Sequence, residues 1–306
     1  MTGSPRDYGR RARSLLLDEP GVRDAVTAAT VSFHEHRTRA FGEIDGEAWR
    51  RWAEAVKSHG LLRLDACLEE AEARLLERGA EVHWAESADE AGRILRGIVE
   101  GAGARTAVKG KSMLSEELGV NALLEEAGVE VFETDLGEFV IQLLDEPPSH
   151  IVGPAIHRSL EDIRALFAER FGTPPDASPE ELAARARDFL REAFLSADVG
   201  ITGGNFLVAE TGSVVLVENE GNIRLTTSVP RVHVALVGIE KVLPRWSDVA
   251  GFVQLASRSA TGQPAPVYAS AIQGPRGDGP DGPEELHVVL VDNGRAGLLA
   301  DEEAWE

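Results

Sequence analysis

The sequence predicts an α/β protein: an open, mostly parallel sheet with helices on both faces and an N-terminal helical extension. Three observations predict this class. Residues 1–78 carry helical patterns alone. From residue 79 onward, apolar runs alternate four times with amphipathic segments, at a spacing of roughly 25 residues. The runs are short and bounded by turn residues, as buried strands are. We therefore expect a helical segment at 1–78 packed on a main domain at 79–300, followed by a tail at 301–306.

The helical extension is clearest over 47–79, where apolar residues recur three and four positions apart and Gly79 marks the stop. The alternation then begins, and three of its helices have serine caps. Ser87 forms a capping box with Glu90, and Ser115 and Ser159 begin later helices. The predicted strands are 80–85, 104–111, 129–135 and 150–155, and the predicted helices are 87–103, 115–128, 136–144 and 159–172.

The second half begins with an amphipathic helix at 178–197. It leads into a strand meander at 198–227, built on the apolar runs FLVA and SVVLV. Residues 231–244 read as one continuous apolar strand that Pro244 ends. The remaining predicted elements are a helix at 246–262, strands at 266–274 and 286–294, and an exposed Gly/Pro/Asp-rich loop at 273–285.

Composition and charge exclude several classes of protein. Hydrophobic residues at 43% and charged residues at 27% are typical of a globular chain. The 52 acidic against 31 basic residues give a formal charge of −21, a field that repels nucleic acid and anionic membranes. No apolar run reaches the roughly 18 residues of a membrane span, and the N-terminal residues lack a signal-peptide core. We expect a cytoplasmic protein that binds no nucleic acid.

Cysteine and histidine usage predicts no metal and no cofactor in this chain. Cys67 is the single cysteine, so the residues hold no internal disulfide and no cysteine-based iron–sulfur or zinc site. It lies in an apolar helical pattern that favours a small core residue. His150 and His157, which flank the predicted strand at 150–155, lack the spacing of a known metal motif.

Two of the four lysines share one tripeptide, Lys109-Gly110-Lys111, which Ser112 and a predicted helix follow. A lysine ammonium is a compact charge that suits a tight anion site, and a helix N-terminus adds exposed N–H groups. The segment predicts binding of a carboxylate or phosphate, although its glycine spacing is not that of a P-loop. Chance placement in a solvated loop is the alternative.

The stretch 198–227 is unusually rich in hydrogen-bonding groups next to glycines. Glycine lets the backbone approach a ligand closely, and amides and hydroxyls give directional contacts. Ordinary turn chemistry favours the same residue types and is an equal alternative. The candidate ligand-binding residues here are Thr202, Gly203, Gly204, Asn205, Thr211, Asn219, Asn222 and Arg224.

Glu210 and Glu218 are the candidate catalytic carboxylates, because each closes an apolar run. Partial burial raises the pKa of a carboxyl group, which suits a general base or a nucleophile. Pairing with Arg224 would make either glutamate structural instead. His157 is a third candidate, placed to polarise a carbonyl, with a helix-cap or core role as the alternative.

Several candidates come directly after predicted strands: Lys109 and Lys111, Glu133 and Asp135, His157, and 202–205. Glu133 and Asp135 suit acid–base work or ribose binding, and Asp135 equally suits a helix cap. Because ligands of parallel sheets bind beyond the carboxyl ends of the strands, we expect these residues to converge on one crevice.

Three stretches resemble the LUD, or lactate-utilisation, domain family: KGKSMLSEELGVNALLEEAGVEVFETDLGEFVIQL, PSHIVGPAIHRS, and the segment from Ala197 to Pro244. The likeness spans roughly 80–300 and is greatest to the LutB-type iron–sulfur branch. It implies the fold of the glucosamine-phosphate deaminase, ribose-phosphate isomerase and CoA-transferase superfamily. It also implies a part in oxidising L-lactate to pyruvate together with a cysteine-rich oxidoreductase subunit and a short LUD protein.

One departure from that branch affects the cofactor. LutB-type proteins continue into a ferredoxin-like domain with two cysteine-rich motifs for [4Fe–4S] clusters, whereas this chain ends at Glu306 with one cysteine. The resemblance therefore implies the LUD portion alone, which is not active by itself. It supplies no established catalytic residues.

Three functions remain open as hypotheses. The first is a component of an L-lactate-oxidising assembly that binds a small anion at the strand ends. The second is an autonomous CoA-transferase- or isomerase-like enzyme on an acyl-CoA or sugar phosphate, with Glu218 as nucleophile; Glu220 between Asn219 and Gly221 weakens that match. The third is a non-catalytic docking subunit.

Overall fold

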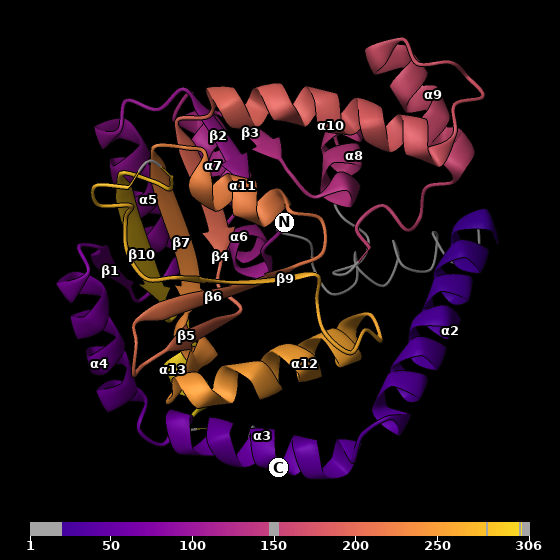
Figure 1. The fold of residues 1–306 in the computed structure, drawn as a ribbon. Coiled ribbons are helices and arrows are strands. Elements are labelled where there is room, and N and C mark those ends of the chain that lie inside the picture. Colours follow the sequence, from indigo (N-terminus) through magenta and orange to yellow (C-terminus); the bar gives the residue numbers. More distant parts are fainter. Residues whose placement is uncertain (1–19, 147–152, 280, 300, 302–306) are drawn as a thin grey trace.

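A six-stranded sheet, parallel throughout, forms the centre of the protein (Figure 1). The computed structural model describes residues 20–146, 153–279, 281–299 and 301. The sheet confirms the predicted fold class, and its strands run in the order β1 (Glu81–Ala85), β10 (Glu285–Val291), β7 (Val232–Gly238), β4 (Val199–Gly203), β2 (Thr106–Lys109) and β3 (Glu130–Glu133).

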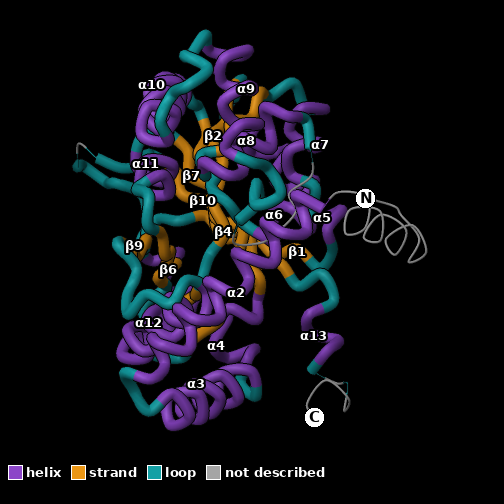
Figure 2. The backbone as a smooth tube through the Cα atoms, turned by 90° about the vertical axis from the view of Figure 1, so that its right-hand side faces the viewer, coloured by secondary structure: helices purple, strands orange, loops and turns teal. Residues whose placement is uncertain are grey.

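Helices cover both faces of this sheet because its strands are apolar on both sides. On one face, α5 (Ala88–Gly101) and α7 (Val120–Glu126) pack against alternate residues such as Val289 of β10. On the other face, α4 (Leu64–Glu77) packs against the intervening residues, such as Val288. Figure 2 shows α5, α6 and α7 on one side of the strands, and α10 and α11 on the other.

A second, four-stranded sheet packs beside the first and was not predicted. Its order is β8 (Val242–Leu243), β5 (Phe206–Val208), β6 (Ser213–Glu218) and β9 (Tyr268–Ile272). The β5/β6 and β6/β9 pairs are antiparallel. Its outer face packs on α12 (Val249–Ala260) and α3 (Gly46–Leu61), where Trp52 and Phe252 lie 5.3 Å apart between ring centroids.

Local capping explains where several remaining helices begin. Ser159 with Asp162 and Ser178 with Glu181 form complete capping boxes, and Asp135 accepts from the backbone N–H groups of Gly137 and Glu138. These residues start α9 (Leu160–Phe171), α10 (Pro179–Ser196) and α8 (Leu136–Leu144). The other helices are α2 (Pro20–Gly42), α6 (Met113–Glu117), α11 (Asn222–Ser228), α13 (Arg295–Leu298) and two 3-10 turns at Ile239–Lys241 and Trp246–Asp248.

The predicted meander at 198–227 is wrong as a single unit. Its first strand, β4, belongs to the parallel sheet, whereas β5 and β6 form a hairpin in the second sheet. The segment Asn222–Ser228 is helix α11 because the side chain of Glu218 caps its N-terminal N–H groups. The predicted continuous strand 231–244 also divides, since a 3-10 turn at Ile239–Lys241 redirects the chain into β8.

Two other predicted elements differ from the structure. The helix predicted at 115–128 is two helices, α6 and α7, because Gly119 adopts a left-handed conformation with φ of 65°. Ser112, not Ser115, caps the first of them. Part of the strand predicted at 150–155 lies outside the described residues, and the described residues Pro154–His157 form a turn, with His157 at its end.

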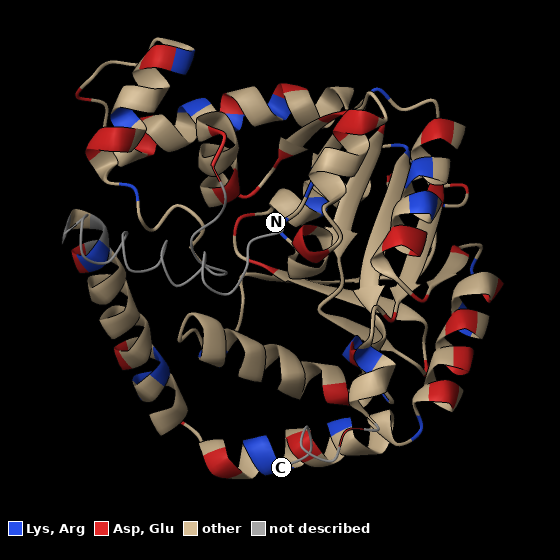
Figure 3. Cartoon of the chain, turned by 180° about the vertical axis from the view of Figure 1, so that it is seen from behind, with Lys and Arg blue, Asp and Glu red and all other residues tan. Residues whose placement is uncertain are grey.

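The N-terminal helices contact the main fold through polar as well as apolar groups. The ammonium of Lys57 in α3 donates to the backbone carbonyls of Glu240 and, at 3.0 Å, Val242. Burial lowers the pKa of Lys57 to about 8. Arg258 of α12 donates to the carbonyl of Ala40 in α2. Charged residues lie mainly on the outer helices and loops, whereas the central strands are largely uncharged (Figure 3).

Candidate functional site

A cavity of about 350 Å³ opens at the carboxyl ends of β2, β4 and β7. Parallel strands end at the same edge of a sheet, so segments far apart in sequence meet there. Lys111 and Ser112 follow β2, and Gly203, Gly204 and Asn205 end or follow β4. The other lining residues are Met113, Leu114, Glu117, Leu216, Val217, Ile223, Leu236, Gly238, Glu240, Lys241 and Arg295.

Glycine is required where β4 reaches the cavity. A Cβ atom on Gly203 would lie 2.6 Å from the Ser112 hydroxyl, and one on Gly204 would lie 2.8 Å from Val237. The absent side chains therefore let the end of β4 pass against Ser112 at the start of α6 and against Val237 of β7. Asn205 fixes the next turn, because its side-chain oxygen accepts from the backbone N–H of Val217 at 2.9 Å.

Ion pairs hold the basic groups of the cavity. The Lys111 ammonium lies 3.0 Å from Asp135, the α8 cap. Arg295 bridges two carboxylates, at 2.8 Å to Glu117 and 2.7 Å to Glu240. Its hydrogen bonds with Glu117 raise the pKa of Arg295 and lower that of Glu117. Lys241 lies 3.3 Å from Glu240. The charged residues of the lining are therefore three cations, Lys111, Lys241 and Arg295, and two carboxylates, Glu117 and Glu240.

Lys109 does not line this cavity, because its fully buried ammonium points into an acidic cluster. It lies 2.9 Å from Glu133 and 3.0 Å from Glu116. Burial lowers the pKa of Lys109, but Glu133, Glu116 and Glu138 outweigh burial and raise it, so the side chain stays charged. Burial and the Glu133 carboxylate raise the pKa of Glu138 to about 8. The three carboxylates lie close enough to share a metal ion, but the Lys109 ammonium already provides their cation.

Thr202 lies directly beneath the edge of the sheet, in contact with a buried histidine. Its hydroxyl is 2.8 Å from Nε2 of His233, which is fully buried in β7. Burial lowers the pKa of His233 to about 3, so the ring is neutral at physiological pH. This pair cross-links β4 and β7, and neither residue belongs to the cavity lining.

Glu218 lies at the end of β6, where both carboxylate oxygens cap α11. They accept from the backbone N–H groups of Ile223 at 2.8 Å and Arg224 at 2.9 Å. Burial raises the pKa of Glu218, against those backbone hydrogen bonds, which lower it. The Arg224 guanidinium lies 4.9 Å from the centroid of the Tyr268 ring. The geometry therefore favours a structural role, and the catalytic role of Glu218 stays a prediction.

The other candidates lie outside the cavity lining among the described residues. Each makes a local contact: Glu210 accepts from the N–H of Trp246, Thr211 bonds Ser213, and Asn219 bonds Gln263 and the N–H of Val267. Asn222 donates to Thr134, and His157 bonds Glu146 at 3.1 Å. The structure thus brings together five of the predicted site residues, Lys111, Ser112, Gly203, Gly204 and Asn205, with Asp135 behind Lys111.

Four charged lining residues were missed: Glu117, Glu240, Lys241 and Arg295. Arg295 follows β10, so the strand-end rule that selected Lys111 also identifies it. Glu240 and Lys241 lay inside a run that the sequence predicted as continuous strand. The 3-10 turn there places them at the cavity instead.

Three comparisons with known proteins bear on the family. The model of the LUD domain matches residues 68–291. Lactate utilization protein B of Shouchella clausii is 44% identical over 302 residues, 98% of this chain and 63% of that protein. The uncharacterized electron transport protein YkgF of Escherichia coli is 42% identical over 301 residues, with the same two coverages. The chain therefore spans about three fifths of the length of these relatives.

One solved structure is also similar. A DUF162 family protein from Deinococcus radiodurans has a TM-score of 0.38 and 17% identity, and the match covers 74% of this chain and 98% of that one. None of the helices in the described part of the chain combines the length and apolar character that crossing a bilayer requires.

Proposed function

This chain belongs to the LUD domain family, and on that premise we propose that it serves L-lactate utilisation by binding a small carboxylate in the strand-end cavity. The relatives' names support the process: one is a lactate utilization protein and another an electron transport protein. Oxidation of L-lactate to pyruvate releases two electrons, which an electron-transport partner accepts. We place this chain in such an assembly, with a cysteine-rich oxidoreductase subunit and a short LUD protein as partners.

The lining of the cavity is the observation that carries the proposal. In a chain of formal charge −21, this cavity places Lys111, Lys241 and Arg295 around one space, with Glu117 and Glu240 in the lining and Asp135 behind Lys111. Its volume lies at the lower end for ligand pockets, which suits a three-carbon acid. Arg295, fixed by two carboxylates, and Lys111, beside the glycine backbone of β4, supply the charge and the donors that a carboxylate binds.

An iron–sulfur cluster does not fit the residues of this chain. Such clusters are held by several thiolates, and Cys67 is the single cysteine here. It is buried in α4 as part of the hydrophobic core cluster that also includes Leu68 and Leu75. Burial raises the pKa of the Cys67 thiol, which disfavours the ligating thiolate form. We therefore assign electron transfer to partner subunits or to segments beyond these residues.

Titration calorimetry with L-lactate and pyruvate tests the proposal. We expect binding to the wild-type chain and a loss of affinity of about a hundredfold or more in the Lys111→Gln/Lys241→Gln variant, because each of the two lost charge-assisted hydrogen bonds contributes about 1.5–3 kcal/mol. The matched control is Arg50→Gln, which removes an exposed ion pair with Glu47 in α3, outside the cavity lining. Its affinity should equal that of the wild type.

Two results would contradict the proposal: no carboxylate binding by the wild-type chain, or binding that survives the double substitution. A second assay addresses the assembly. The isolated chain should not reduce an artificial acceptor with L-lactate, and turnover should appear only when the partner subunits are added. Robust turnover by the chain alone would favour an autonomous enzyme.

A further inference from the structure

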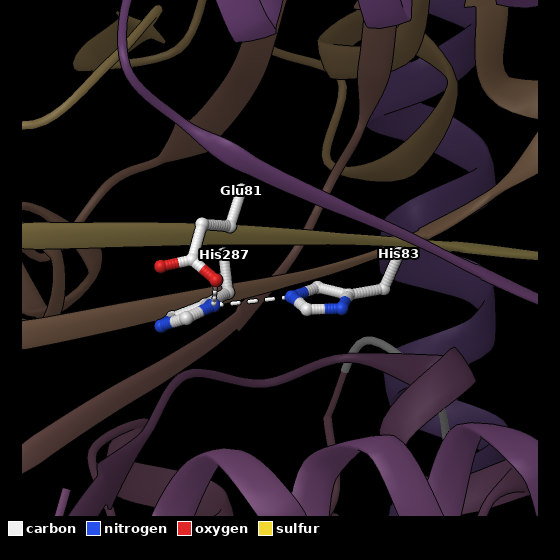
Figure 4. Close-up of side chains that lie close together, drawn as sticks. All are labelled: Glu81, His83 and His287. Carbon is white, nitrogen blue, oxygen red and sulfur yellow. Dashed lines mark hydrogen bonds and ion pairs between the residues drawn. The ribbon is translucent and has the colours of Figure 1, made fainter. Parts of the chain in front are cut away.

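Two histidines and a glutamate lie close together on the neighbouring strands β1 and β10. Glu81 and His83 lie two residues apart on the same face of β1, and His287 lies opposite Glu81 in β10. Nε2 of His83 is 3.1 Å from Nδ1 of His287, and a Glu81 oxygen is 3.6 Å from the same Nδ1. Figure 4 shows the two rings and the carboxylate turned toward one another.

We propose that Glu81, His83 and His287 form a binding site for a zinc-class transition-metal ion. Zinc binds imidazole nitrogen and carboxylate oxygen at about 2.0–2.2 Å, so two ligand atoms of a tetrahedral site lie roughly 3.3 Å apart. The spacings of 3.1 and 3.6 Å bracket that value, and all three donor atoms lie within 4.8 Å of one another. Two histidines, one carboxylate and a water complete a common donor set for this ion.

The histidines are suited to the task because, in the hydrogen bond between their rings, one of the two facing nitrogens accepts through a free lone pair. Burial lowers the pKa of His83, and His287 lowers it further. A metal binds the free lone pair of a neutral ring. The two facing nitrogens share one proton in their hydrogen bond, so binding requires only that the donating ring carry that proton on its other nitrogen. His287 is buried, whereas Glu81 is exposed and gives the ion a route from solvent.

A further carboxylate, that of Glu285, supports the orientation in which Nδ1 of His287 faces the proposed ion. Its second nitrogen, Nε2, lies 3.7 Å from a carboxylate oxygen of Glu285, two residues earlier on the same strand face. Metal-binding histidines commonly present the other N–H to a carboxylate, which fixes the ring and its tautomer. Arg231 pairs with Glu285 and also donates to the carbonyl of Ala102, so that carboxylate is itself held.

The site would tie an edge strand to its neighbour. β1 is the outermost strand and pairs only with β10 in the sheet, so an ion shared by the two strands stabilises the folded chain by mass action. The cluster lies in the amino halves of β1 and β10, whereas the cavity lies at the carboxyl ends of the strands. Metal binding here and carboxylate binding there are therefore separable by experiment.

Zn²⁺ titration of the chain, freed of any affinity tag and treated with a chelator, tests the site. We expect one ion per chain and, at about a hundred times the dissociation constant, a rise in melting temperature on the order of 5 °C. Co²⁺ should give the visible absorption of a low-coordinate nitrogen–oxygen site. Mg²⁺ at the same concentration should change neither signal, because it prefers oxygen ligands in octahedral geometry.

Four variants locate the ion. His83→Gln and Glu81→Gln alter side chains that reach solvent and should fold normally, and each should weaken Zn²⁺ binding at least about tenfold, as should Glu285→Gln through the outer carboxylate. The control is His59→Gln, an exposed histidine in α3, which should bind as the wild type does. The proposal is overturned if the wild-type chain binds no Zn²⁺, or if His83→Gln and Glu81→Gln both retain wild-type affinity and the Co²⁺ spectrum.

Discussion

Glu138 in the cluster around Lys109 gives a stability prediction with an unusual sign. Its carboxyl group is buried, and its pKa rises from 4.5 to about 8. A shift of that size corresponds to roughly 5 kcal/mol at 1.36 kcal/mol per unit. The folded chain keeps this proton up to about pH 8, whereas the unfolded chain releases it near 4.5. The free energy of unfolding therefore decreases as pH rises between these values, and the loss is complete above pH 8.

Glu138→Gln should remove this loss and stabilise the protein. Glutamine has the shape of the protonated acid, and its amide N–H group is a donor beside the Glu133 carboxylate, which raises the pKa of Glu138. The variant should match the wild type near pH 4.5, exceed it by about 3 kcal/mol at pH 7, and by about 5 kcal/mol above pH 8. Urea unfolding at pH 5, 7 and 8.5, with equal m-values, measures the difference.

Glu133→Gln is the matched control with the opposite sign. Glu133 accepts from the Lys109 ammonium at 2.9 Å and from Asn121 at 2.7 Å. Its loss leaves a buried lysine with Glu116, a partner whose side chain is 37% exposed, and should cost about 3–5 kcal/mol. The reasoning fails if Glu138→Gln is no more stable than the wild type at pH 8.5, or if its advantage is the same from pH 5 to 8.5.

Two further predictions concern the sheet. His233 has a pKa lowered to about 3, so only the unfolded chain takes up its proton near pH 6.5; stability should fall by about 5 kcal/mol from pH 6.5 to 3. His233→Asn should reduce this slope in urea unfolding at pH 4 and 7, and an unchanged slope would exclude His233 as its source. Gly200→Ala should destabilise by about 3 kcal/mol or more in the same assay, because its Cβ would lie 1.9 Å from the carbonyl oxygen of Thr226. The control, Gly97→Ala in α5, meets no atom within 4 Å and should stabilise by about 0.5–1 kcal/mol; equal effects of the two alanines would contradict the packing argument.

Much of the parallel sheet could be predicted because its signals are local. β1, β2 and β3 are each followed by a helix, and Ser87, Asp135 and Ser159 satisfy the first N–H groups of their helices through contacts within three residues. Such signals act over one turn of chain and are visible in sequence. Helix α11 has no such local capping signal, because the side chain that caps it, Glu218, belongs to the preceding strand.

The candidate site was predictable in part for the same reason. Lys111, Ser112 and the segment 203–205 were identified because each directly follows a strand, and the parallel arrangement brings these ends together. The sequence did not predict which way each side chain points. Lys109 and Lys111 are two residues apart and would share one face of a continuous strand. However, β2 ends at Lys109, so the Lys109 ammonium enters the acidic cluster while Lys111, beyond the strand, reaches the cavity.

By itself, the sequence determined the fold class and the family, and it indicated the edge of the sheet where we propose that a ligand binds, since these follow from periodicity, strand–helix order and motif. Only the tertiary structure decided the second sheet and the meeting of His83 with His287, which are 204 residues apart. Pairing between distant strands depends on how the whole chain packs, and no local propensity encodes it. The protonation of Glu138 was decided in the same way, because it depends on burial beside a carboxylate from another element.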